Sequence, residues 1–273
     1  MIKQAKHPTW IYVSLIFMIL ALLTFTFLPL VSSFLQADFL SKTTTAVSKA
    51  QQSVQEKYEI EAQGYQVVLE REPDNQSALK GLINARLNQN DLKGSIPSLE
   101  KLAQLNPNAS DYTLLLAQAK QQVGEIKAAE GIYRALLKKE PDNLLAIKGL
   151  SDLWLTQGQP QTAINFVKRY LSQARVASGS KPFPDLISLQ LLLSEIYVSQ
   201  KRFDEALTLY DSAIKIDKKD FRPLLAKSIL LQQQGKTEEA GPLWQQAIDN
   251  APVEYKDQIK QLAAQTESLL RVN

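Results

Sequence analysis

The side chains that most often carry out chemistry in proteins are nearly missing from this sequence. It contains no cysteine and a single histidine, His7, which lies outside any segment expected to form a globular unit. The absence of cysteine excludes disulfides, thiolate metal sites and cysteine nucleophiles. With no histidine in the expected globular part, neither a Ser-His-Asp triad nor a histidine-based zinc site can form there.

Any enzymatic chemistry would therefore depend on carboxylates, lysines and hydroxyl groups. The sequence has no glycine-rich phosphate loop and no dinucleotide-binding fingerprint. Asp152 and Glu195 are the one acidic pair worth inspecting, since paired acids with raised pKa values mark many catalytic clefts. We expect no catalytic, cofactor-binding or metal-binding residue, and we keep an enzyme subunit using these carboxylates as an alternative.

The charge of the chain gives little reason to expect a nucleic-acid partner. There are 31 basic and 28 acidic residues, for a net charge of +3. Lys3 and Lys6 precede the first acidic residue, Asp38, so the rest of the chain is close to neutral. No basic stripe stands out, and nucleic-acid binding needs one.

The amino-terminal region contains a segment long enough to cross a membrane. No charged side chain occurs from Pro8 to Ala37, and residues 10–31 are almost wholly apolar. At about 1.5 Å per residue a helix of this length reaches about 33 Å, enough for the hydrocarbon core. We expect a retained transmembrane helix from Trp10 to Val31 after a short flank, 1–9. The alternative is a cleaved signal peptide, whose apolar region is usually shorter, about 7–15 residues.

The rest of the chain is repetitive. Pro73, Pro107 and Pro141 are spaced by 34 residues, Pro184 follows after 43, and Lys218 and Pro252 continue the 34-residue spacing. Frames beginning at Gln76, Ser110, Leu144, Ile187 and Phe221 place similar residues in register. The eighth position is mostly small and the twentieth always so, which suits two helices that nearly touch. The fifteenth position suits a turn with positive φ. The twenty-fourth position is bulky: Leu99, Tyr133, Val167, Tyr210 and Trp244.

This pattern resembles the tetratricopeptide repeat family over about residues 40–252. The resemblance implies an all-α solenoid, a right-handed superhelix of helix pairs. We expect this solenoid to follow the transmembrane helix that the apolar segment 10–31 predicts. Five units are expected over 76–252: 76–109, 110–143, 144–186 with an insertion at 175–183, 187–220 and 221–252.

The ends of the array are expected to differ from its middle, because terminal repeats face water. Residues 32–75 are interpreted as a linker followed by either a degenerate first repeat or one long helix. Residues 253–273 are expected to form an amphipathic capping helix. The insertion at 175–183 is basic at its edges. It is either a partner-binding loop or a tolerated surface insertion.

The resemblance implies a concave face lined by the first helix of each unit, at the second, fifth, ninth, twelfth and thirteenth positions. Such faces hold peptides, helices or partner domains. Amide side chains suit an extended peptide backbone, because they both donate and accept hydrogen bonds. Gln121 and Gln232 are among the residues expected there. The predicted protein-binding groove consists of Lys80, Asn84, Asn88, Gln118, Gln122, Lys148 and Asp152.

One known binding mode of this family does not fit. Chaperone co-factors of this fold clamp a C-terminal carboxylate with basic and amide side chains on three helices. Lys80 and Asn84 match the first pair, but Leu115, Leu145 and Gly149 occupy the remaining places. The sequence therefore argues against a clamp of this kind.

An amino-terminal anchor followed by such an array looks like bacterial and plastid assembly factors. Our leading hypothesis is a scaffold in a thylakoid or bacterial plasma membrane that holds a client protein during assembly of a complex. The alternative is an envelope-side chaperone or receptor for secreted or apocytochrome clients. The expected partners are other proteins and, through residues 10–31, a membrane.

Overall fold

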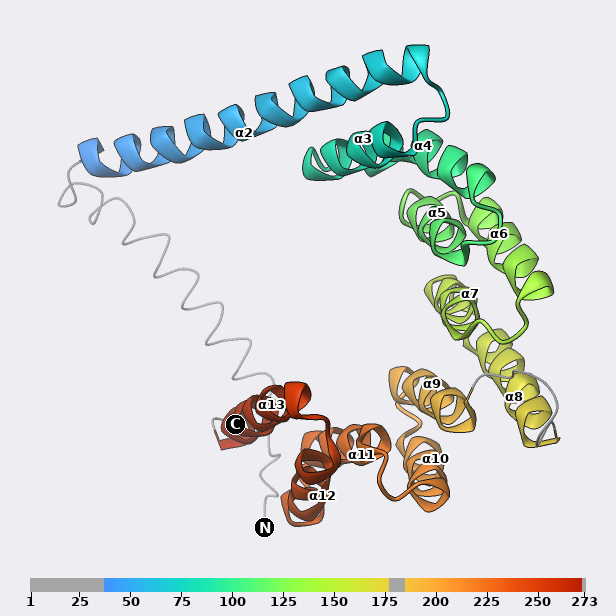
Figure 1. The fold of residues 1–273 in the computed structure, drawn as a ribbon. Coiled ribbons are helices and arrows are strands. Elements are labelled where there is room, and N and C mark those ends of the chain that lie inside the picture. The colour runs from blue at the N-terminus through green and yellow to red at the C-terminus, as the bar shows by residue number, and fades with distance from the viewer. Residues whose placement is uncertain (1–36, 177–184, 272–273) are drawn as a thin grey trace, which may run out of the picture.

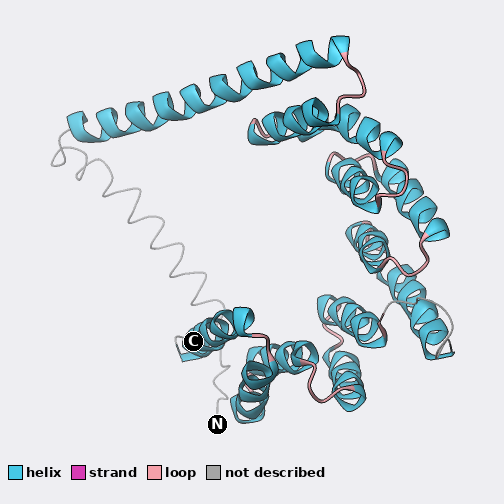
Figure 2. Cartoon of the chain, in the orientation of Figure 1, coloured by secondary structure: helices cyan, strands magenta, loops and turns pink. Residues whose placement is uncertain are grey.

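The computed structural model describes the backbone of residues 37–176 and 185–271, and the side chains of residues 54–175 and 185–266. Within these ranges the chain forms twelve helices and no strand (Figure 2). Among these helices, none combines the length and the apolar character that a membrane crossing needs. The predicted transmembrane segment 10–31 and most of the insertion at 175–183 lie outside the described residues.

The helices follow one another along an open arc (Figure 1). A long helix, α2, precedes five helix pairs, and a single helix, α13, follows them. The first helices of the pairs lie on the inner side of the arc and the second helices on its outer side. The bounds are α2 Ala37–Arg71; α3 Gln76–Asn88 and α4 Leu92–Leu105; α5 Ser110–Gln122 and α6 Ile126–Lys139; α7 Leu144–Thr156 and α8 Pro160–Val176; α9 Leu186–Ser199 and α10 Phe203–Ile216; α11 Phe221–Gln233 and α12 Thr237–Asn250; α13 Val253–Arg271.

Side-chain caps begin several of the first helices. The Asn75 side chain accepts a hydrogen bond from Ala78 N at 3.0 Å, and Asn143 accepts one from Ala146 N at 3.0 Å. Asp185 and Asp220 cap α9 and α11 in the same way. Each cap satisfies a backbone N–H that has no partner inside its helix. The Pro-Asp-Asn runs in the sequence therefore mark the places where one unit stops and the next begins.

The turn inside each pair has the same geometry in all five units. The fifteenth position has a positive φ in every case, although two of these residues are not glycine. The next residue donates its backbone N–H to the carbonyl five residues earlier, as in Arg202 N to Tyr197 O at 2.9 Å. This bond, which closes a helix in a Schellman motif, requires the left-handed conformation at the residue before it. The five φ values are 59° at Asn90, 83° at Gly124, 70° at Gly158, 58° at Lys201 and 77° at Gly235.

Small residues let the two helices of each pair approach closely. The residues at the twentieth position, Ser95 and four alanines, have no exposed surface. Those at the eighth position are also buried, and the three serines among them bond back to carbonyls of their own helix. The bulky residues at the twenty-fourth position are buried between successive units, as their spacing predicts. The core therefore runs along the array instead of forming one centre.

Residues 37–71 form one long helix and not a helix pair. Its carboxyl-terminal half takes the place of a second helix, because Ala62 is buried against Leu82 and Ala85 of α3. If a repeat frame began 34 residues before Gln76, Tyr65 would occupy its twenty-fourth position. The Tyr65 ring lies against Gly81, where a Cβ would come within 2.3 Å of the ring. The same contact recurs two repeats later, between Tyr133 and Gly149.

Helix α13 packs at the opposite end of the array. Ile259 is buried against Leu231 and Trp244 of the last pair, and the rings of Phe221 and Tyr255 stack 5.9 Å apart. α13 therefore covers apolar surface that a sixth repeat would otherwise bury.

We predict that Gly149→Ala destabilises the array by about 1–3 kcal/mol, the usual range for overpacking a core. A Cβ at this position would lie 2.5 Å from the Tyr133 ring, which is itself buried and has little room to move. Gly131→Ala in α6 is the matched control, since a Cβ there meets nothing within 4 Å. It should stabilise by about 0.5–1 kcal/mol through helix propensity. Thermal or urea unfolding measures both, and equal effects of the two substitutions would contradict the proposed packing.

Candidate functional site

The predicted groove residues lie on three consecutive inner helices. Lys80, Asn84 and Asn88 are on α3, Gln118 and Gln122 on α5, and Lys148 and Asp152 on α7. The first five are exposed and the last two are half-buried. The repeat register alone therefore placed them on successive first helices, which form the inner side of the arc (Figure 1).

The amino-terminal half of this face has side chains with few internal partners. The Lys80 ammonium lies 5.6 Å from the centre of the Tyr112 ring, on the next first helix. The Asn88 amide donates to the Asn84 carbonyl at 2.9 Å, which leaves the Asn84 side chain free to contact a ligand. Within the described part of the chain, the exposed amides of Gln118 and Gln122 make no hydrogen bond. These groups can exchange hydrogen bonds with a bound polypeptide.

Lys148 joins two neighbouring units in the middle of the face. Its ammonium lies 2.7 and 2.8 Å from the two carboxylate oxygens of Glu195 on α9, and 3.7 Å from Asp152. The two acids considered as a catalytic pair are therefore both neighbours of one lysine. Lys148 therefore forms a salt bridge mainly with Glu195, and the two acids do not form a pair of carboxylates that share a proton.

Asp152 is the less well compensated of these two acids. Burial raises the pKa of its carboxyl, the Lys148 charge opposes the rise, and the Glu195 charge adds to it. Two tyrosines lie nearby. Burial and then the charge of Asp152 raise the pKa of Tyr133 to about 12, and burial and then Glu195 do the same for the pKa of Tyr210. Both phenols are therefore neutral, and Tyr133 donates to Gln121 at 3.3 Å.

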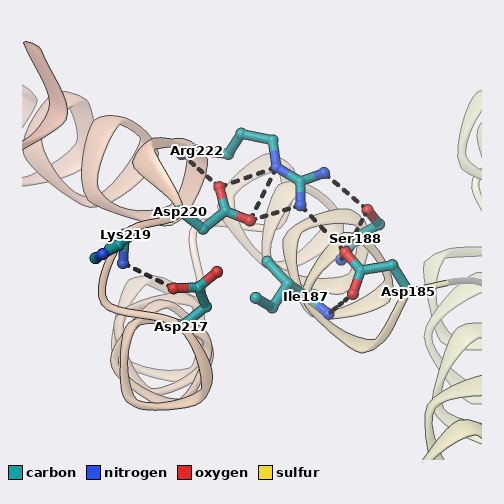
Figure 3. Close-up of polar contacts among 7 residues, drawn as sticks. All are labelled: Asp185, Ile187, Ser188, Asp217, Lys219, Asp220 and Arg222. Carbon is teal, nitrogen blue, oxygen red and sulfur yellow. Dashed lines mark hydrogen bonds and ion pairs between the residues drawn. The ribbon is translucent and has the colours of Figure 1, made fainter. Parts of the chain in front are cut away.

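Arg222 links the beginnings of α9 and α11 (Figure 3). Its guanidinium lies 2.6 Å from an Asp220 oxygen, 3.1 Å from Asp185 and 2.9 Å from the Ser188 hydroxyl. Asp185 also accepts hydrogen bonds from the backbone and hydroxyl of Ser188. Burial disfavours the ionised form of Asp185, but these hydrogen bonds outweigh it and hold its pKa below the usual range. Charge therefore holds the two helix starts together.

A cleft of about 470 Å³ lies between α7, α9 and α11. Most of its wall is apolar, and three charged side chains stand at its rim: Lys148, Glu195 and Arg222. The remaining lining residues are Leu144, Ser188, Leu191, Leu192, Val198, Tyr210 and Ala226. In the repeat register, the lining residues stand at the first, second, fifth, sixth, ninth and twelfth positions, on the first helices. Tyr210, on α10, stands at a twenty-fourth position.

The prediction of an amide-lined groove needs two corrections. Gln232 is not available to a ligand: it is 3% exposed and accepts a hydrogen bond from the Trp244 indole. Gln121 is half-buried and receives the Tyr133 hydroxyl in the equivalent way. The reason is shared by these two units, because the buried Tyr133 hydroxyl and Trp244 indole each need an acceptor, and the glutamine at the twelfth position supplies it.

Sequence reasoning also missed the apolar part of the groove. Leu115 and Leu145 are 48% and 60% exposed, and Leu87 is 44% exposed. They occupy the sixth, second and twelfth positions, which line the cleft in other units. In the sequence, Leu115 and Leu145 are notable only because they replace polar residues of a carboxylate clamp. That replacement was the one sequence signal for an apolar surface at these positions.

Comparison with known proteins identifies the repeat. Two family models described as Tetratricopeptide repeat match residues 114–179 and 187–220. The chain therefore matches this repeat in two segments that together span α6–α10. A crystal structure of yeast Tom70 is similar in fold to this helical array, with 16% identity, a TM-score of 0.51 and coverage of 77% of this chain and 43% of that one.

Two further similarities concern bacterial proteins. A structure of TTC0263, a thermophilic TPR protein of Thermus thermophilus, is 16% identical, with a TM-score of 0.47 and coverage of 70% of this chain and 98% of that one. Cellulose synthase 1 operon protein C of Komagataeibacter xylinus is 30% identical over 161 residues, or 58% of this chain. This chain spans 11% of that relative's length.

We predict that Asp152→Asn stabilises the protein at neutral pH. A carboxyl whose folded-state pKa is raised above its ordinary value of 3.8 favours folding when protonated, and it disfavours folding once ionised. The gain over wild type should therefore be absent near pH 3–4 and grow as the pH rises above that value. Thermal unfolding across this range measures it. A variant less stable than wild type at pH 7 would mean that the Lys148 pairing outweighs burial.

We predict that Asp185→Asn destabilises the protein at neutral pH, the opposite of the effect of Asp152→Asn. Asparagine keeps the capping role, so the change isolates the charge facing Arg222. Because the folded-state pKa is lowered from 3.8, the stabilisation is present above that value and is lost as the pH falls through the folded pKa. We expect a loss of about 0.5–1 kcal/mol at pH 7, typical of a partly exposed ion pair. The exposed Glu70→Gln serves as the control in the same unfolding experiment, and an equal effect there would refute the assignment.

Proposed function

We propose that this protein is a scaffold that holds a segment of a client protein along the concave face of its array. The observation that carries the proposal is the inner face of α3, α5, α7 and α9. There, exposed amides and exposed leucines lead into an apolar cleft. Amides can bond a backbone while leucines and the cleft bury side chains, and this combination suits a polypeptide.

A polypeptide fits this face better than a nucleic acid does. The ionisable groups of the groove are of both signs, and the basic ones at its centre already contact acids. Lys148 pairs with Glu195, and Arg222 pairs with Asp220 and Asp185. Binding a phosphate backbone depends on several uncompensated basic side chains.

The proposal includes a membrane tether. Its support is the apolar, uncharged segment 10–31 in the sequence, followed closely by α2. The carboxyl-terminal half of α2 packs against α3, so its amino-terminal half, about 25 Å long, would separate the array from its anchor. A scaffold tethered in this way in a thylakoid or bacterial plasma membrane would meet clients during assembly of a membrane complex.

The groove is tested by changing Lys80 and Asn84 together to alanine. Hydrogen bonds to charged groups contribute about 1.5–3 kcal/mol and neutral ones about 0.5–1.5, so losing both should cost roughly 2–4 kcal/mol of client binding. That corresponds to a decrease of about 30- to 1000-fold in affinity. Crosslinking and capture of the full chain from native membranes identifies the clients, and titration of a captured client measures the loss.

The control is a pair of exposed lysines on the outer helix α6, Lys127 and Lys138. Lys139 is unsuitable, because its ammonium bonds the Pro107 carbonyl and the Asn108 side chain across a unit boundary. If the α6 variant loses its clients while the groove variant keeps them, the chosen binding face is wrong.

The tether is tested separately by extraction. If residues 10–31 form a retained transmembrane helix, the full chain stays in the membrane pellet after an alkaline carbonate wash. Deleting residues 1–31 should release it to the supernatant. A mature protein beginning near Phe34 would instead support a cleaved signal peptide.

A further inference from the structure

The cleft between α7, α9 and α11 is large enough to hold part of a ligand. A cavity of about 150 Å³ already accommodates benzene, and this cleft measures about 470 Å³. Its apolar wall comes from three inner helices and one outer helix, so a bound group would contact two successive unit boundaries. The cleft therefore suits a large apolar side chain, such as phenylalanine, leucine or methionine. The wall residues are Leu144, Leu191, Leu192, Val198, Tyr210 and Ala226.

The charges around this cleft are unequal. Lys148 and Arg222 are the cations, and four carboxylates contact them: Asp152, Asp185, Glu195 and Asp220. The group therefore carries an excess of two negative charges. A ligand that enters the cleft therefore meets more carboxylates than basic side chains.

These acids differ in how well they are compensated. Asp185 and Asp220 share Arg222, and Glu195 holds Lys148 through both of its oxygens. Asp152 is left with a single contact to Lys148, at 3.7 Å, and its side chain is 42% exposed. It lies one helical turn beyond Lys148 on α7, beside the cleft. Burial raises its pKa, which is the expected response of a carboxylate that lacks a full counter-charge.

We propose that the cleft binds a large apolar side chain of the client segment and that a neighbouring lysine or arginine of the same segment pairs with Asp152. This inference rests on the proposed function, since it describes the segment that the groove holds. An acidic segment or a C-terminal carboxylate fits poorly, because Lys148 and Arg222 already face acids and would have to leave them. The client is therefore basic and apolar where it crosses α7 and α9.

Three fluorescent 12-residue peptides test the proposal with the full chain. The first carries a central phenylalanine between two lysines in a neutral alanine and glutamine background. The second replaces the lysines with glutamate, and the third replaces the phenylalanine with alanine. Fluorescence anisotropy should give an affinity at least about ten-fold higher for the first peptide than for either of the others. Equal affinities, or a preference for glutamate, would overturn the proposal.

Two variants locate the binding. Asp152→Asn should weaken the lysine peptide by about 2- to 5-fold, the range of a partly exposed ion pair, and should reduce its salt dependence. Ala226→Phe fills the cleft and should abolish the preference for phenylalanine over alanine in the peptide. Ala135→Phe, on the exposed outer side of α6, is the matched control and should change neither affinity. If Ala226→Phe fails to fold, the three peptides and Asp152→Asn still decide the outcome.

The results separate this inference from the proposed function. Suppose that client capture depends on Lys80 and Asn84 but the protein shows no preference for the lysine peptide. That result would refute this inference and leave the proposed function intact. Clients captured independently of the groove would remove the proposed function itself. A lysine preference that persists unchanged in both Asp152→Asn and Ala226→Phe would place the basic segment elsewhere on the protein and overturn the site assigned here.

Discussion

The close approach of the two helices in each pair is the contact on which the rest of the structure depends. At the twentieth position Ser95 and four alanines have no exposed surface, and the residues that face them at the eighth position are buried as well. A larger side chain at the twentieth position would separate the two helices and disturb the units that pack beyond them, whereas the eighth position tolerates Ile83 in the first unit. Since each unit contacts only its neighbours, the pair geometry repeats along the chain and sets the curvature of the arc.

That geometry also determines which side chains a ligand can meet. With the second helix fixed behind the first, the first-helix positions that point away from their partner form a continuous inner face. The same constraint explains the exceptions on this face. Polar aromatic residues at the twenty-fourth position, Tyr133 and Trp244, take the twelfth-position glutamines as acceptors and so withdraw them from the groove. What remains exposed is a mixture of amides and leucines.

The charged groups of the groove have two different relationships to stability. The Arg222 group stabilises the fold, because it caps two helices and joins their starts (Figure 3). Asp152 has a raised pKa and one long contact, so its ionised form works against folding. This contrast separates the Arg222 group, which supports the array, from the Asp152 carboxylate, which we propose as a contact for a partner.

The sequence by itself determined the helical class, the 34-residue period, the units and the turn positions, because these depend on local rules of spacing, capping and backbone conformation. Even Lys201, which is not a typical turn residue, adopts the positive φ that its position requires. The sequence could not decide between a long helix and a helix pair over residues 42–73, since the apolar spacing suited both. Only the tertiary structure showed that Gln232 is buried, that Lys148 prefers Glu195 to Asp152, and that three units enclose a cleft. Burial, charge pairing and cavities arise from distances between residues far apart in the chain, and no local pattern encodes those distances.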